Sequence, residues 1–478
     1  MATQHEEQHD TTNGEADLWR AHQELSEVDL RFRRLARHDD ELQRRATFPA
    51  LVAQSPYFQY RRQLWPTFAS RRWVRDFAVA SVGVNDLVRS VPGRVFGNDP
   101  AALARFYRID EGQARLALSA PDGLAGAVGR ADFVISRTGC WCVELNLTAC
   151  LGGWETGLMA PMLLEVPAIA RFIAAEGLAV GYSNTLRLLL AHVVRNALAA
   201  GLADAEVNVA VLCPRPVAGS PYAPLLVREY AAALADCAPK ATGSIGMCVL
   251  ADLGEHGGRL WLGERRLHAV IQWIMGPGDS AVVRCFKAGN LHLYDAPLCP
   301  LLSDKRTLAL LSERAESSVF TAAERRIIRD HIPWTRLLVA GEITFAGERV
   351  ALPAFVLARQ HELVLKKGQS QGGEAVILGR FTSAADWRSA VEATMAAGDW
   401  IVQEYVESLP FLFQEGDAGC SPHDVVWGPF VFGDAYAGTI LRLQPKALGG
   451  IVNLSREATE GVILEVDDDP RAGEAMSA

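Results

Sequence analysis

A predicted β-hairpin near residue 140 constrains this chain more than any other segment. Residues 130–135 and 142–146 alternate between polar and apolar side chains, as strands with one buried face do. Between them, Arg137-Thr138-Gly139 is typical of a three-residue hairpin loop with glycine in the left-handed position. The apolar face of the second strand would consist of Trp141, Val143 and Leu145.

Four polar side chains gather on one face of this predicted hairpin. The three-residue loop places Asp132 opposite Glu144. It also places Arg130 opposite Asn146. Two carboxylates, an amide and a guanidinium in one place indicate a divalent cation and a phosphate. The alternative is the solvent-facing side of a half-buried sheet, and a two-residue loop would move every pair to the other face.

The composition excludes several classes of protein. The chain has 478 residues, a formal net charge of −9 and a pI of about 5.7, which argues against nucleic-acid binding. Its nine cysteines are scattered without a CxxC pair, which indicates reduced thiols and a cytoplasmic location. The N-terminal segment is polar and acidic, unlike a signal peptide, and no charge-free apolar run reaches about 18 residues, so we expect no membrane span.

The order of helical and strand patterns indicates a mixed α and β protein. Helical patterns extend over 17–46, 70–90 and 99–118, with a turn expected at Val91-Pro92-Gly93. From Glu206, an apolar strand, a helix and a second strand follow one another, as in a small parallel sheet. The segment FVLARQ is expected to be a strand, and the last part of the chain is antiparallel β in character.

The segment VLKKGQSQGGEAV permits three interpretations. It can be a phosphate-covering loop, in which glycines allow close approach and Lys366 supplies a charge. Residues 368–372 also fit the G-x-S-x-G pattern of a nucleophile elbow, but that motif needs a following helix, whereas 373–378 has the pattern of a strand. The third interpretation is a hairpin loop with no further role.

This Gly-rich loop is preceded by a lysine-bearing strand and followed by a helix, and the next strand ends in Gln403-Glu404-Tyr405-Val406. Together these elements resemble the first half of an ATP-grasp nucleotide site. Proteins of that family carry a metal-binding E-x-N pair after this point. Here such a pair, Glu144-Leu145-Asn146, precedes it. The order therefore resembles the circularly permuted ATP-grasp proteins, whose enzymatic branch includes glutathionylspermidine synthase. Gly129-Arg130-Ala131-Asp132-Phe133 is similar to the G-R-F-D-F segment of that branch.

The resemblance implies roles for individual residues. Mg²⁺, or Mn²⁺ in its place, would be held by Asp132, Glu144 and Asn146, and the transferred phosphoryl group would lie near Arg130 and Arg442. ATP would be bound by Lys305, Lys366, Lys367, Gly368, Gln369, Gly372, Gly373, Gln403, Glu404, Tyr405 and Val406. Which of Lys366 and Lys367 contacts phosphate stays open. The family's D-T-P-T segment is replaced by Leu147-Thr148-Ala149-Cys150, which leaves the substrate unassigned.

The implied fold is α+β or α/β: an ATP-grasp fold in circularly permuted order, with a small parallel-sheet domain and an N-terminal helical region. The expected divisions are a disordered tail (1–16), the helical region (17–128), the metal- and phosphate-binding part (129–204), the pre-ATP-grasp-like domain (205–300), the nucleotide-binding region with its lid loop (301–466) and a second disordered tail (467–478).

The implied activity is that of an ATP-dependent carboxylate–amine ligase. ATP would phosphorylate the carboxylate of a small molecule or peptide, and an amine would then attack the acyl phosphate, with ADP and phosphate as products. Two alternatives remain open: a phosphotransferase of the same fold, and a catalytically inactive nucleotide-binding scaffold. No nucleic-acid or membrane partner is expected.

Overall fold

The computed structural model describes residues 15–44, 60–119, 124, 126–215, 220–274, 277–345, 347–370, 375–416, 419–454 and 458–467. The two predicted disordered tails lie outside the described residues except for residues 15, 16 and 467. Residues 15 and 16 begin a helix that extends to residue 25, so the disorder prediction is wrong for them.

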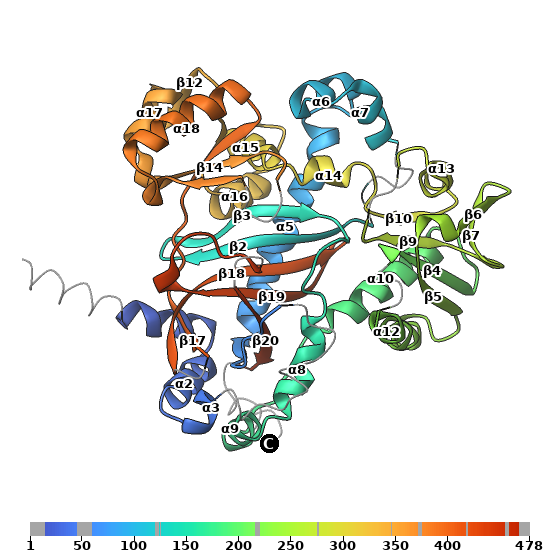
Figure 1. Ribbon diagram of the computed structural model, residues 1–478, viewed down its shortest axis with the longest axis horizontal. Coiled ribbons are helices and arrows are strands. Elements are labelled where there is room, and N and C mark those ends of the chain that lie inside the picture. Colours follow the sequence, from blue (N-terminus) through green and yellow to red (C-terminus); the bar gives the residue numbers. More distant parts are fainter. Residues whose placement is uncertain are drawn as a thin grey trace, which may run out of the picture.

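A seven-stranded sheet forms the centre of the molecule (Figure 1). Its strands are β1 (Thr67–Ser70), β2 (Val128–Ser136), β3 (Gly139–Leu147), β17 (Phe411–Gln414), β18 (Cys420–Phe432), β19 (Ala435–Pro445) and β20 (Thr459–Val466). They lie in the order β1-β20-β19-β18-β2-β3, with β17 also paired to β18. The antiparallel strands expected in the last part of the chain are therefore confirmed, and the early hairpin β2–β3 is paired directly with them.

The structure confirms the predicted hairpin register but not the predicted loop. Ser136 pairs with Gly139, so the loop has two residues rather than three. A bulge in β3 then leaves Val143 without a partner in β2, and this extra residue offsets the shorter loop. The predicted pairs therefore form: Asp132 with Glu144, and Arg130 with Asn146.

The same bulge changes which side chains of β3 are buried. Cys142 and Leu145 are buried, although they would lie on opposite faces of a regular strand. Trp141 and Val143, which the alternating pattern assigned to the buried face, are only partly buried. The predicted apolar face of this strand is therefore wrong on the loop side of the bulge.

Helices from the N-terminal region cover one face and one end of the central sheet. They are the helix over 15–25, α2 (Glu27–Ala36), α3 (Asp40–Gln43) and α5 (Arg71–Arg94). The next two helices, α6 (Pro100–Tyr107) and α7 (Glu111–Ala117), pack against each other apart from this sheet (Figure 1). Helix α5 contacts β2, β18, β19 and β20 and passes across the sheet (Figure 1). It continues through Val91-Pro92-Gly93, so the turn predicted there is wrong. Pro92 lies in the last turn of the helix, where both it and Val91 are buried.

The strand–helix–strand prediction after Glu206 is confirmed. A four-stranded parallel sheet has the order β10-β9-β4-β5. Its strands are β4 (Glu206–Leu212), β5 (Thr242–Cys248), β9 (Ala269–Gln272) and β10 (His292–Tyr294), with α12 (Tyr222–Cys237) between β4 and β5. Alongside it lie α13 (Ala281–Lys287) and a small sheet of β6 (Leu253–His256), β7 (Arg259–Leu262) and β8 (Arg265–Arg266).

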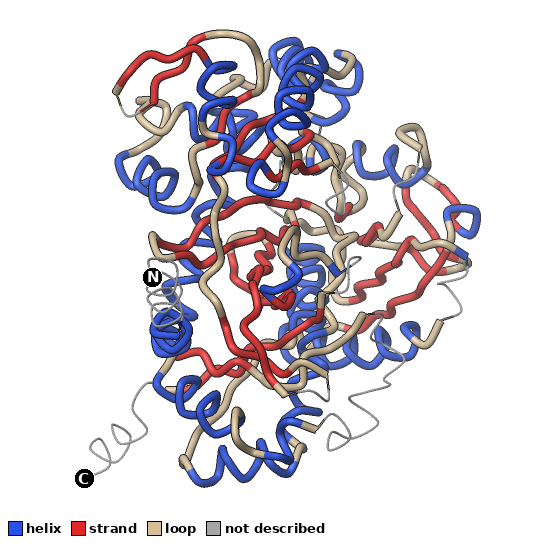
Figure 2. The backbone as a smooth tube through the Cα atoms, turned by 60° about the vertical axis from the view of Figure 1, so that its left-hand side comes forward, coloured by secondary structure: helices blue, strands red, loops and turns tan. Residues whose placement is uncertain are grey.

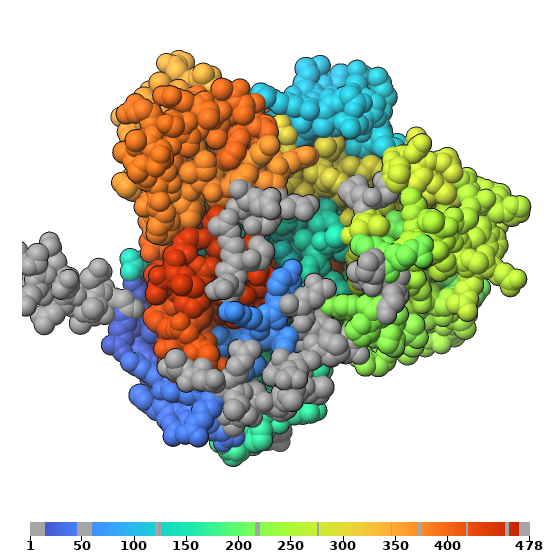
Figure 3. All heavy atoms as spheres, in the orientation of Figure 1, coloured from blue at the N-terminus to red at the C-terminus, as the bar shows by residue number. Residues whose placement is uncertain are grey.

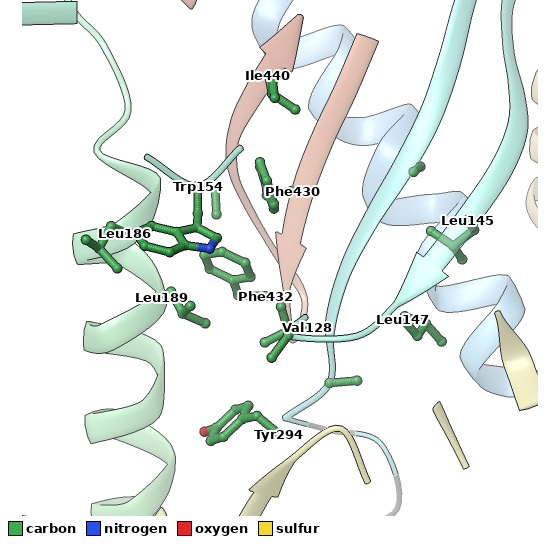
Figure 4. Packing of buried hydrophobic residues seen from close by; sticks show 14 of the residues in the cluster. Val128, Leu145, Leu147, Trp154, Leu186, Leu189, Tyr294, Phe430, Phe432 and Ile440 are labelled. Carbon is green, nitrogen blue, oxygen red and sulfur yellow. The ribbon is translucent and has the colours of Figure 1, made fainter. Parts of the chain in front are cut away.

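Helix α10 (Thr185–Ala199) connects this sheet to the central one, because it contacts β4 and α12 as well as β18 and β19. Figure 4 shows Trp154 lying between Leu186 of this helix and the rings of Phe430 and Phe432 on β18. These side chains belong to one large buried cluster that extends over both sheets.

A smaller lobe with its own apolar core stands beside the central sheet, and Figure 2 shows its strands as a separate group. Its antiparallel sheet has the order β11-β16-β14-β15, formed by β11 (Thr335–Leu337), β14 (Leu363–Lys367), β15 (Val376–Leu378) and β16 (Trp400–Glu404). The lobe also contains the hairpin of β12 (Glu342–Phe345) and β13 (Glu348–Ala351), and the helices α17 (Leu352–Ala358) and α18 (Ala384–Ala397).

The strand expected at FVLARQ is wrong, because most of this segment belongs to α17. Pro353 occupies the first turn of the helix, where proline is favoured. Leu352 and Val356, one helical turn apart, are both buried in the core of the lobe. A short apolar run does not distinguish a strand from a buried helix.

The remaining helices are α8 (Thr156–Leu164), α9 (Pro167–Ala175), α14 (Cys299–Leu302), α15 (Arg306–Glu313) and α16 (Ala322–His331). Of these, α14 and α16 pack against β3. No single helix of the described residues is long and apolar enough to cross a membrane, although α8 and α9, bent by 75° at their junction, reach that length and composition together.

Candidate active site

A cleft of about 460 Å³ lies where the hairpin, β14, β16, β18 and β19 meet. Ten of the site residues predicted from the sequence line it: Arg130, Asp132, Glu144, Asn146, Lys366, Gln403, Glu404, Tyr405, Val406 and Arg442. In Figure 3 the orange lobe and the green parallel-sheet part lie on either side of this central region. The fold therefore brings together residues from three segments that are far apart in the sequence.

The carboxylate of Asp132 lies between two buried guanidinium groups. Arg442 Nη2 on β19 contacts Asp132 Oδ1, and Arg130 Nε lies 3.6 Å from the same oxygen. Burial opposes ionisation of Asp132, but Arg442 and Arg130 outweigh it, and the pKa of Asp132 lies below its ordinary value. Arg130 also donates from Nη1 to the carbonyl oxygen of Gly152 at 2.8 Å, which fixes its orientation.

Glu144 is paired with Lys305, whose Nζ lies 3.1 Å from Glu144 Oε1. Lys305 is at the N-cap of α15, and its side chain is almost entirely buried. The same ammonium group donates to the carbonyl oxygen of Ser370 at 3.0 Å. Lys305 therefore joins the hairpin to the Gly-rich segment, although it does not itself line the cleft.

Lys366 is the lysine of β14 that faces the cleft. Its Nζ donates to Gln403 Oε1 at 2.7 Å and to the carbonyl oxygen of Val143, the bulge residue, at 3.1 Å. Burial lowers the pKa of Lys366, Glu144 raises it and Lys305 lowers it, and the resulting pKa is about 8. Lys367 lies on the other side of the strand, where its Nζ is 3.8 Å from Asp399 Oδ2.

The Gly-rich segment is only partly described. Gly368 is in close contact with Asp304 and Asp399, because a Cβ there would come within 2.7 Å of Asp304 Oδ1 and 2.9 Å of the Asp399 carbonyl oxygen. This close packing alone explains why residue 368 is a glycine, so the glycine is not by itself evidence of a bound ligand. Gln369 is exposed, and Gly372 and Gly373 lie outside the described residues.

The strand that follows the Gly-rich segment is inconsistent with a nucleophile elbow. The segment lies between β14 and β15, which pair in antiparallel fashion. A nucleophile elbow needs a strand, a sharp turn and a helix, whereas the next described element here is the strand β15. The carbonyl and hydroxyl oxygens of Ser370 instead accept hydrogen bonds from Lys305.

The sequence interpretation missed two buried carboxylates behind the arginines. Glu460 on β20 is directly opposite Arg442 and only 1% exposed. Burial, with Glu155 beside it, raises the pKa of Glu460 to about 8. Burial also raises the pKa of Glu155. Only the pairing of β19 with β20 reveals this arrangement, and nothing in the local sequence indicates it.

A third missed carboxylate, Asp424 on β18, lines the cleft next to the Gln403–Val406 segment. Lys446 Nζ lies 3.3 Å from Asp424 Oδ1 and 3.3 Å from Glu407 Oε1. Burial raises the pKa of Asp424, and Lys446 acts in the opposite direction. This ion-pair network lies at the junction between the smaller lobe and the central sheet.

The residues predicted to hold a metal provide oxygen ligands only. Asp132, Glu144 and Asn146 all line the cleft. Carboxylate and amide oxygens suit Mg²⁺, which favours hard ligands and is commonly shared with phosphate groups. Within the described residues, no group of three or more His, Cys, Asp and Glu side chains is placed to hold a metal by itself.

Comparisons with known proteins identify the fold. No family model matches the chain, and no curated protein matches it by sequence. Among solved structures, the apo form of a glutathione synthetase-like effector from Globodera pallida is similar over 84% of this chain and 90% of that chain, with a TM-score of 0.55 and 12% identity. The chain has a glutathione synthetase-like α+β fold. At this identity the similarity describes the fold alone.

Proposed function

We propose that this chain is an ATP-dependent carboxylate–amine ligase of the circularly permuted ATP-grasp type, and that the cleft binds ATP with Mg²⁺. The observation that carries the proposal is that Arg130, Arg442 and Lys366 line one cleft beside Asp132 and Glu144, with Lys305 paired to Glu144. These cationic side chains would bind a polyphosphate through charge-assisted hydrogen bonds.

Each part of the site has a role in this proposal. The adenine ring would lie beside Gln403–Val406, where the lobe joins the central sheet. Asp132, Glu144 and Asn146 would hold Mg²⁺, which supplies charge neutralisation at the phosphates when bound. Lys366, rather than Lys367, would contact phosphate, because only Lys366 faces the cleft.

The proposed reaction has two steps. An oxygen of the acceptor carboxylate bonds to the γ-phosphorus, and the bond from that phosphorus to the bridging oxygen of ADP breaks. An amine then attacks the acyl carbon, phosphate leaves, and the amine loses a proton. Arg130 and Arg442 would stabilise the phosphoryl group in transfer, because a planar guanidinium donates two hydrogen bonds to phosphate oxygens.

Trapping with hydroxylamine tests the proposal without knowledge of the natural amine. The full-length protein is incubated with MgATP, a panel of carboxylic acids and hydroxylamine, and ADP and hydroxamate are measured. A ligase produces both in equal amounts. ADP with a stable phosphorylated acceptor indicates a phosphotransferase, and nucleotide binding without ADP release indicates a scaffold. Either of these last two outcomes contradicts the proposal.

Substitution of a proposed metal ligand gives a quantitative prediction. In Glu144→Gln, the Mg²⁺ concentration needed for half-maximal MgATP binding is expected to rise about 10- to 100-fold, because a neutral amide is a weaker ligand for a hard cation. Titration of Mg²⁺ at fixed ATP measures it. Glu111→Gln, an exposed change on α7, is the matched control. An unchanged requirement in Glu144→Gln removes this residue from the metal site.

The depressed pKa of Lys366 predicts how ATP affinity depends on pH. The side chain is charged below about pH 8 and neutral above it, so the affinity for ATP is expected to fall about 10-fold between pH 7 and pH 9. Binding is measured by titration calorimetry at each pH. Arg stays protonated over this range, so Lys366→Arg is expected to abolish the decrease. The same decrease in affinity in Lys366→Arg would show that a group other than Lys366 causes the pH dependence.

A further inference from the structure

The residues assigned to nucleotide and metal do not account for one end of the cleft. Beside Arg130, the loop that follows β3 lines this end with Thr148, Cys150, Leu151 and Gly152. Gly152 accepts a hydrogen bond from Arg130, so the loop lies directly beside the proposed phosphoryl site. In this end the loop takes the place of the D-T-P-T segment of the similar family. We refer to it as the acceptor end.

The loop is fixed from the side of the parallel sheet. Thr148 Oγ1 donates to Asp295 Oδ2 at 2.6 Å, and Cys150 Sγ donates to the carbonyl oxygen of Trp273 at 2.7 Å. Trp273 and Asp295 follow the carboxyl ends of β9 and β10, the edge at which parallel sheets most often bind ligands. Asp295 holds a positive φ of 82°, which is unusual for a residue with a side chain.

The charged side chains that line the cleft come from segments other than the loop at the acceptor end. The described lining residues that carry a charge are Arg130, Asp132, Glu144, Lys366, Glu404, Asp424 and Arg442. They belong to the hairpin, β14, β16, β18 and β19. The described residues of the acceptor end offer a hydroxyl, a thiol and aliphatic carbon. A charge on the substrate placed there would lose water without gaining a counter-ion.

We infer that the acceptor is a monocarboxylic acid whose remaining part is uncharged and partly apolar. Its carboxylate lies beside Arg130, and its apolar part lies against Cys150 and Leu151. This inference rests on the proposed ligase function and adds the class of its substrate. It disfavours polyamines and peptides with several charges as the group bound at this end.

Three acids of similar size test the inference: N-acetyl-leucine, N-acetyl-glutamate and Nα-acetyl-lysine. With the full-length protein, MgATP and hydroxylamine, kcat/KM for hydroxamate formation is expected to be at least about 10-fold higher for N-acetyl-leucine than for the other two. Cys150→Arg, which places a cation in this end, is expected to shift the ratio toward N-acetyl-glutamate. Val79→Arg, at an exposed position on α5, is the matched control and keeps the ratio of the unchanged protein.

MgATP binding in the same samples separates two kinds of failure. Equal or higher kcat/KM for a charged acid, with MgATP bound, overturns the acceptor class alone, whereas absence of MgATP binding overturns the proposed function. If MgATP binds and no acid reacts, a labelling experiment tests whether the acid binds at the acceptor end. The measurement is how far each acid protects Cys150 from N-ethylmaleimide, and the label that is lost in Cys150→Ser is the one on Cys150. Selective protection by N-acetyl-leucine supports the inference, and its absence overturns it.

Discussion

Arg130→Ala is expected to lower the rate of ATP-dependent turnover by about 10³-fold, with a much smaller effect on MgATP binding. An arginine that neutralises a phosphoryl group in transfer contributes mainly to the transition state, where charge spreads over the phosphoryl oxygens. Arg130 is buried beside Asp132 and oriented by the Gly152 carbonyl, so its position is fixed before substrate binds. The measurement is the rate of ADP release under saturating MgATP.

Two further variants make this result interpretable. Arg130→Lys keeps the charge but loses the planar pair of donors, and its rate is expected to lie between those of Arg130→Ala and the unchanged protein. Arg137→Ala removes an exposed arginine from the loop of the same hairpin and is expected to retain full activity. The fold should survive Arg130→Ala, because Asp132 keeps Arg442 as its partner. Turnover within about 10-fold of the unchanged protein would contradict the assigned role.

Asp29→Ala is expected to lower the free energy of unfolding by about 3–5 kcal/mol. Asp29 lies fully buried on α2, with His22 Nδ1 2.6 Å and Arg33 Nη2 3.2 Å from its oxygens. It also accepts a hydrogen bond from the backbone nitrogen of Phe68 on β1. The substitution leaves Arg33 as a buried cation without its carboxylate. Chemical denaturation followed by circular dichroism measures the change.

A surface pair on the next helix provides the control for this prediction. Asp40 pairs with Arg44 one turn away at 3.6 Å, and both side chains are mostly exposed. Asp40→Ala is expected to change the free energy of unfolding by no more than about 0.5 kcal/mol, because exposed ion pairs contribute little. Equal losses in the two variants would show that the buried network does not stabilise the junction of α2 and β1.

The sequence predicted local elements well where periodicity was strong. The parallel unit from Glu206 and the final antiparallel strands were both expected from their patterns. The segment FVLARQ and the turn at Val91-Pro92-Gly93 were not predicted correctly, because burial within the tertiary structure decided both. A four-residue apolar run such as 355–358 fits a strand as well as a helix.

The hairpin register was predicted correctly for an incorrect reason. The expected three-residue loop has two residues, and the bulge at Val143 compensates for the difference. The bulge also turns the Val143 carbonyl oxygen toward Lys366, so it connects the hairpin to the smaller lobe. Such a compensation depends on partners far away in the sequence, and residue patterns within the hairpin do not reveal it.

The same limit applies to the rest of the site. Residues in recognisable motifs were found from the sequence, and ten of them line one cleft. Glu460, Asp424 and Asp295 were missed, because each acquires its place only through the pairing of distant strands or the contact between two sheets. Consecutive side chains of β14 point in opposite directions, and this alone determines that Lys366 and not Lys367 faces the cleft.

A crystal structure with a non-hydrolysable ATP analogue and Mg²⁺ tests the central claim most directly. We expect the adenine ring beside Gln403–Val406, the metal bound by Asp132, Glu144 and Asn146, and the γ-phosphate within hydrogen-bond distance of Arg130. A nucleotide bound outside this cleft, or a metal held without any of these three ligands, would contradict the proposed function.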